Sequence, residues 1–212
     1  METESKLLKN YETLVAFGCS NTFGLGITDS YTTPSEYAWP AKLGKQLGLQ
    51  VKNLGSAGIS NKELCNKIIN TKFKNTDLVV VLWTHDDRHC IIKDNNTVTR
   101  INVWDKTLLS NYFYKYFYND YDQKIINYMF YSLAHLYLTE KKIKHFFLHQ
   151  KQIYLGLNLN WNKNLFLDCF FEDAIKGHDM SKDNIHTGIS GQAAFAKAVY
   201  TSILNNKLYN FT

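Results

Sequence analysis

The feature that most constrains this sequence is a short apolar run near its start that ends abruptly at a glycine. Residues 14–17 are Leu-Val-Ala-Phe, and Gly18 follows at once. A continuous run of this length with a glycine exit is typical of a buried parallel strand and its exit turn. Ser20 then lies just beyond the carboxyl end of the strand, where ligands bind in open α/β sheets. The small residues around Ser20 leave peptide N–H groups free to face an anion.

The next segments alternate between helix and strand. Apolar residues at helical spacing predict helices over residues 34–49 and 61–73, with Ser60 as the cap of the second. Strands are predicted over 49–54 and 77–83, and the latter is the most strand-like run of the chain. Strands and helices in this order predict right-handed crossovers and a doubly wound parallel sheet of the α/β class, with three α/β/α layers.

Residues 90–142 are an aromatic-rich insertion. An Asp-Asn-Asn turn between β-branched residues predicts a hairpin over 91–104 that lies over the sheet ends. Helices are predicted over 106–118 and 121–142, and a strand over 143–149. The second of these helices has a predicted apolar face formed by Ile125, Ile126, Met129, Phe130, Leu133 and Leu136.

The function of the aromatic residues in the insertion stays open. Core and surface packing is the simplest explanation for the cluster, although aromatic rings also line sugar and acyl sites. The tyrosines of this cluster are Tyr112, Tyr114, Tyr116 and Tyr118. The later segment 150–177, which contains Trp161, is predicted to be an irregular connection with a short helix. A final amphipathic helix is predicted from about residue 193.

Length and composition favour one globular domain over residues 1–212, with an ordinary apolar fraction of 45%. No stretch is long enough to span a membrane, and the charged amino terminus lacks the apolar core of a signal peptide. We therefore expect a cytoplasmic location. The cysteines have neither metal-like nor disulfide-framework spacing, which predicts free thiols. They are Cys19, Cys65, Cys90 and Cys169.

Charge gives little support for a nucleic-acid partner. The net charge is +5, but only Arg88 and Arg100 among the 24 basic residues are arginines. Specific nucleic-acid recognition relies on arginine, so we expect no such partner. His85 and His89, with neighbouring aspartates and Cys90, resemble a set of metal ligands, but no second cluster completes it. The sequence therefore predicts neither a metal nor another cofactor.

The carboxyl-terminal part of the chain supplies the partners that a nucleophilic serine needs. Asp183 and His186 are three residues apart, just before the last predicted helix. An aspartate at this spacing can accept a hydrogen bond from Nδ1 of the histidine, which leaves Nε2 free to take a serine proton. The sequence therefore predicts a catalytic triad of Ser20, His186 and Asp183.

In four blocks the sequence resembles the SGNH hydrolases, also called GDSL-type esterases. Residues 17–24 resemble the nucleophile block of that family, and 53–60 resemble the second block. Residues 79–86 follow a strand as the third block does, and 183–186 match the fourth. The resemblance implies the flavodoxin-like SGNH fold and a serine esterase that hydrolyses small esters, such as O-acetyl carbohydrates or short acyl esters.

The resemblance also implies an oxyanion hole. It would be formed by the backbone N–H groups of Ser20 and Gly58, with His85 where the family has asparagine. A neutral imidazole can donate one hydrogen bond and so replace the amide. Alternatively, His85 is a loop histidine that pairs with Asp86 or Asp87. In the first block, Cys19 stands where aspartate is usual.

Two other function classes stay open. A binding module on the same fold would hold an acylated glycan without cleaving it. This alternative remains because His85 stands where the family has its oxyanion asparagine. A flavodoxin-like nucleotide binder would use the loop after the first strand to hold a phosphate. Such a binder would not need the Asp183–His186 pair.

Overall fold

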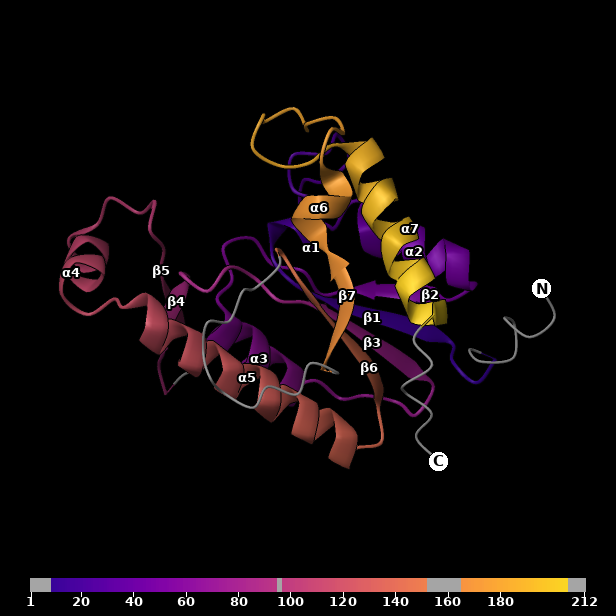
Figure 1. The fold of residues 1–212 in the computed structure, drawn as a ribbon, viewed down its shortest axis with the longest axis horizontal. Helices are drawn as coiled ribbons and strands as arrows, with labels where there is room; N and C mark the ends of the chain where they lie inside the picture. Colours follow the sequence, from indigo (N-terminus) through magenta and orange to yellow (C-terminus); the bar gives the residue numbers. More distant parts are fainter. Residues whose placement is uncertain (1–8, 95–96, 152–164, 206–212) are drawn as a thin grey trace.

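The apolar run that ends at Gly18 lies in a strand that is second from one edge of a five-stranded parallel sheet (Figure 1). The computed structural model describes residues 9–94, 97–151 and 165–205. The strand order is β2-β1-β3-β6-β7, which is the flavodoxin-like order once the two strands of the insertion are set aside. The strands are β1 (Thr13–Phe17), β2 (Gln50–Asn53), β3 (Asp77–Leu82), β6 (Lys144–His149) and β7 (Phe166–Phe170).

Helices cover both faces of the sheet, as the doubly wound prediction requires (Figure 1). Helices α2 (Trp39–Leu47) and α7 (Ile189–Asn205) pack on the face that receives Leu14 and Ala16 of β1. The opposite face receives the alternate residues, Val15 and Phe17, and is covered by α3 (Asn61–Ile69) and α5 (Asp120–Glu140). The predicted three-layer α/β/α fold is confirmed. Two short helices, α1 (Ser20–Phe23) and α6 (Phe171–Ile175), follow directly after β1 and β7.

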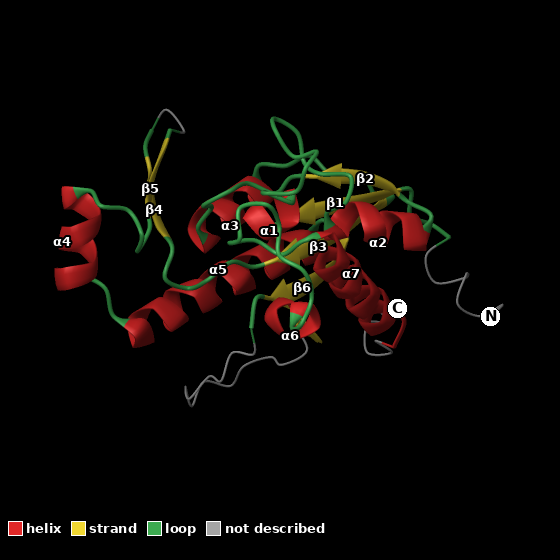
Figure 2. Cartoon of the chain, turned by 90° about the horizontal axis from the view of Figure 1, so that it is seen from above, coloured by secondary structure: helices red, strands yellow, loops and turns green. Residues whose placement is uncertain are grey.

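The insertion forms an arm that projects beyond the sheet (Figures 1 and 2). It consists of the antiparallel hairpin β4 (His89–Ile92) and β5 (Val98–Ile101), followed by α4 (Leu108–Tyr116). The antiparallel pairing of the predicted hairpin is confirmed, but the hairpin belongs to the projecting arm and does not lie over the sheet ends as predicted. Much of the aromatic and aliphatic surface of the arm is exposed to solvent: Trp104, Leu108, Tyr112, Tyr116 and Phe117.

Helix α2 and strand β7 differ most from the predicted elements. Helix α2 begins at Trp39 rather than at residue 34, because the preceding residues form a turn in which Asp29 accepts hydrogen bonds from Ser35 and from the backbone of Glu36. Strand β7 was predicted as irregular chain. It pairs with β6 through a shift of register, and exposed Asp168 interrupts its apolar pattern. Trp161 lies outside the described residues.

The predicted apolar face of α5 is only partly buried, because Phe130 packs against the core but three of its side chains face solvent. Met129, Leu133 and Leu136 are 62%, 49% and 65% exposed, whereas the helix buries a different set of residues. Two polar side chains fix the rotation of the helix, because Asn127 and Tyr131 both bond to Asp86 after β3. The buried residues of α5 are Gln123, Asn127, Tyr131, Ala134 and Leu138.

Replacing leucine by alanine at either of two positions of α5 tests this rotation. Leu138→Ala removes a fully buried side chain and is expected to lower the free energy of unfolding by about 2–5 kcal/mol. Leu136→Ala is the matched control and is expected to change it by less than about 0.5 kcal/mol. Urea denaturation of both variants measures the difference, and equal losses would contradict the observed packing.

Candidate active site

Ser20 lies where the strand order of the sheet reverses. Strand β1 pairs with both β2 and β3, so the chain leaving β1 lies beside the chain leaving β3. Ser20 is the first residue of α1 and is 6% exposed. The turn before it has no room for a side chain at Gly18, where a Cβ would lie 2.0 Å from Oγ1 of Thr22. The glycine therefore allows α1 to start directly at the strand end.

Asp183 and His186 form the predicted pair. Nδ1 of His186 lies 2.6 Å from Oδ2 of Asp183. Oδ1 of Asp183 accepts from Ser181 Oγ and from the backbone N–H groups of Ile185 and His186, at 2.6, 2.9 and 3.0 Å. Partial burial raises the pKa of Asp183, but these bonds outweigh it and hold the pKa well below the usual value. The carboxylate is therefore charged at neutral pH and fixes the ring of His186.

The loop that carries this pair packs against the chain that leaves α1. The backbone N–H of Lys182 donates to the carbonyl of Gly26 at 3.3 Å. Gly26 has φ +84°, and a Cβ there would lie 2.5 Å from Oδ2 of Asp183. Within the described residues, Ser20 Oγ and His186 share no hydrogen bond. Such catalytic bonds are often long before substrate binds. The structure thus joins Asp183 to His186 and brings their loop to the segment after Ser20.

Two glutamine side chains hold the loops around the serine together. Gln192 of α7 accepts from the backbone of Trp39 at 2.8 Å and donates to the carbonyl of Asn21 at 3.2 Å. Gln150, directly after β6, accepts from the side chain of Asn21 at 3.1 Å and donates to the carbonyl of Trp83 at 3.3 Å. No local pattern in the sequence indicates either glutamine, because their partners lie more than 60 residues away.

Gly58 lies in the turn after β2, and residues of the arm hold this turn. The guanidinium of Arg100 donates to the carbonyl of Ala57 at 2.5 Å and to Ser56 Oγ at 3.0 Å. It also forms a bidentate ion pair with Glu63 of α3, at 2.8 and 2.7 Å. Arg100 thus connects hairpin, turn and helix through four hydrogen bonds. The φ of Gly58 is +69°, a left-handed conformation that favours glycine.

The segment after β3 is fixed by a buried asparagine. Asn61 exchanges two hydrogen bonds with the backbone of Thr84, at 2.9 and 3.1 Å. Its amide also donates to the hydroxyl of Tyr131 at 3.2 Å, and this hydroxyl donates to Asp86 Oδ1 at 2.8 Å. His85 is held between Thr84 and Asp86 by this network. The sequence pattern predicts Asn61 only as the first residue of a helix, because its partners Thr84 and Tyr131 are distant in the chain.

Burial shifts the pKa of His85 and of Asp86, the two residues that follow Thr84. Burial lowers the pKa of His85, and the nearby Arg88 lowers it further, so the imidazole is neutral at pH 7. Burial raises the pKa of Asp86 to about 6, against the hydrogen bond from Tyr131, which lowers it. A neutral His85 can donate one hydrogen bond, as the predicted role at the oxyanion requires.

The described residues contain no group of three or more histidine, cysteine, aspartate or glutamate side chains placed to hold a metal ion. The ring of His89 instead packs against Phe113, Tyr114 and Tyr118 of the arm. All four cysteines are buried free thiols. In the part of the chain that the structure describes, no helix has both the length and the apolar character needed to cross a bilayer.

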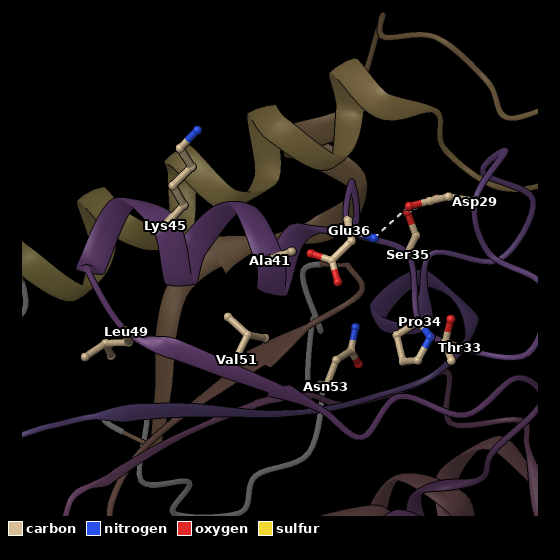
Figure 3. Close-up of a pocket in the computed structure, with 10 residues that line it drawn as sticks. All are labelled: Asp29, Thr33, Pro34, Ser35, Glu36, Ala41, Lys45, Leu49, Val51 and Asn53. Atoms are coloured by element: carbon tan, nitrogen blue, oxygen red, sulfur yellow. Dashed lines mark hydrogen bonds between the residues drawn. The ribbon is translucent and has the colours of Figure 1, made fainter.

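A separate cavity of about 720 Å³ lies between α2, β2 and the turn before α2 (Figure 3). Asp29 braces the turn at one end, and the carboxylate of Glu36 points into the space between helix and strand. Asn53 belongs to the wall of the cavity. Its amide also donates to the carbonyl of Thr22 in α1, at 2.7 Å. None of the predicted site residues lines this cavity.

Known structures share this fold over nearly the whole chain. An acetyl xylan esterase from Butyrivibrio proteoclasticus matches with TM-score 0.55 and 10% identity, over 92% of this chain and 64% of its own. TesA matches with TM-score 0.54 and 16% identity, over 91% and 98%. A G-D-S-L family protein from Desulfitobacterium hafniense DCB-2 matches with TM-score 0.50 and 15% identity, also over 91% and 98%. No family model and no curated protein sequence matches the chain.

The fold is therefore that of the SGNH, or GDSL-type, hydrolases. At the level of the fold, this confirms the resemblance stated from the four sequence blocks. The identities of 10–16% lie far below the level at which activity follows from similarity. The chemistry must be argued from the residues of the site.

The raised pKa of Asp86 predicts how stability depends on pH. Below about pH 4 the carboxyl of Asp86 is protonated in both the folded and the unfolded chain, so its ionisation does not change the free energy of unfolding. Between about pH 4 and 6 only the unfolded chain ionises, so stability falls as pH rises, and the loss persists above pH 6. Asp86→Asn removes this loss while it keeps an acceptor for Tyr131. The variant is expected to gain stability relative to wild type between pH 4 and 7, measured by urea denaturation. A constant difference across this range would contradict the prediction.

Proposed function

We propose that the protein is a serine esterase that hydrolyses small esters through an acyl-enzyme. The observation that carries the proposal is the Asp183–His186 pair, joined at 2.6 Å, whose loop packs against the segment after Ser20. The charged Asp183 holds the imidazole with Nδ1 protonated. Nε2 is then the acceptor for the proton of Ser20 Oγ.

In the proposed first step, Ser20 Oγ attacks the ester carbonyl while His186 Nε2 takes its proton. The tetrahedral intermediate collapses as His186 returns the proton to the alcohol, which leaves. In the second step His186 takes a proton from water, and the resulting hydroxide attacks the acyl-enzyme. The acid is released, and Ser20 regains its proton from His186.

The proposed oxyanion hole uses the backbone N–H groups of Ser20 and Gly58, with the neutral imidazole of His85. Ser20 begins a helix, so its N–H has no partner within the helix. The clamp by Arg100 supports the role of Gly58, because oxyanion donors act through fixed positions.

The proposed substrates are O-acetyl carbohydrates or short acyl esters. The acetyl xylan esterase named above supports this range by fold alone. The half-exposed tyrosines and tryptophan of the arm support a substrate with a sugar ring, because aromatic faces bind such rings.

Labelling with a fluorophosphonate tests the nucleophile without the true substrate. Intact-mass analysis is expected to find one adduct on wild type and none on Ser20→Ala. His186→Ala is expected to react at least about 100-fold more slowly, because the general base is lost. Asp183→Asn should slow labelling as well, since the ring of His186 is then no longer held by a charged partner.

Ser30→Ala is the matched control, because among the described residues the hydroxyl of Ser30 bonds only to the carbonyl of Ile27, in the turn before α2. This variant should label like wild type. A folded wild type that forms no adduct would contradict the proposal, and the binding of an acylated glycan without cleavage would then be the function to test.

A further inference from the structure

Asn102 directly follows the hairpin of the arm and lies beside Gly58. A Cβ placed on Gly58 would lie 3.8 Å from Nδ2 of Asn102, which is the nearest atom to it. The next nearest atoms belong to Arg100, which clamps the turn that contains Gly58. The arm therefore contributes two neighbouring side chains to the proposed oxyanion region, one of which fixes the turn.

The backbone of Asn102 is firmly anchored, whereas its amide is not engaged. Its N–H donates to Asp105 Oδ2 at 2.9 Å, and its carbonyl accepts from Ser110 Oγ at 2.6 Å. The residue is only 5% exposed, yet Oδ1 is buried without a partner in the described part of the chain. Nδ2 makes no hydrogen bond there either, and unlike Oδ1 it is not fully buried. A buried amide oxygen without a partner costs stability, and an amide that the protein holds at neither atom is free to turn its NH₂ group toward a ligand.

We propose that the amide of Asn102 is a further side-chain donor to the ester oxyanion, beside the N–H of Gly58 and in addition to the imidazole of His85. This inference rests on the proposed esterase function and assigns it a further catalytic residue. The third sequence block has the imidazole of His85 instead of an asparagine amide, and Asn102 would add an amide donor to that imidazole. The donor would come from the insertion, on a residue that neighbouring side chains hold at both backbone groups.

The test compares hydrolysis of p-nitrophenyl acetate by wild type, Asn102→Ala and Asn102→Asp. Loss of the donor is expected to lower kcat by about 100- to 1000-fold, with KM within about twofold of wild type. Asn102→Asp keeps the side-chain shape but replaces the donor by a negative charge, so it should lose at least as much. Fluorophosphonate labelling should slow in parallel, because the phosphonate also develops an oxyanion. Thr99→Ala on the same hairpin is the matched control and should match wild type.

Each outcome decides between the two proposals. A wild type that hydrolyses the ester, with Asn102 variants within threefold of its kcat, overturns the role of Asn102 and leaves the esterase intact. A wild type that neither hydrolyses nor labels overturns both. A rise in KM with unchanged kcat in the Asn102 variants, or an equal fall of kcat in Thr99→Ala, shows a structural role and overturns the inference. If Asn102→Ala is unfolded by circular dichroism, Asn102→Asp is judged by the same criteria.

Discussion

The parallel pairing of β1 with both β2 and β3 is the constraint on which the rest of the structure depends. It places the ends of three strands at one edge of the sheet, so that Ser20, Gly58 and His85 follow neighbouring strands. Each of these residues comes from a different loop, and none could approach the others without the sheet. The strand order also makes this edge the place where a crevice forms in flavodoxin-like folds.

Hydrogen bonds from side-chain amides then fix the positions of the loops at these strand ends. Asn61, Gln150 and Gln192 bond to backbone groups of the loops after β3 and β1. Loops carry polar backbone groups that must be paired when they are buried. These amides supply that pairing without adding charge beside a serine nucleophile. The clamp by Arg100 does the same for the turn of Gly58, and it ties the arm to the body of the protein.

The sequence predicts those parts of the fold that depend on local pattern. The run ending at Gly18, the central strand β3 and the Asp183–His186 pair all have local signals, and the structure contains each of them. It does not predict features that depend on distant partners. The rotation of α5 follows from bonds to Asp86, more than 40 residues away. The position of Asn102 beside Gly58 likewise requires the arm to fold back onto a turn that no local pattern connects to it.

In the proposed mechanism, Ser20, the Asp183–His186 pair and the donors beside Gly58 act on one ester group. The crystal structure of the protein after reaction with a fluorophosphonate tests this most directly. We expect phosphorus bonded to Ser20 Oγ, with His186 Nε2 facing the adduct. We also expect a phosphoryl oxygen within about 3.1 Å of the Gly58 N–H and of the Asn102 amide. A phosphonate bound to another residue, or an oxygen turned away from Gly58, would rule out the proposed mechanism.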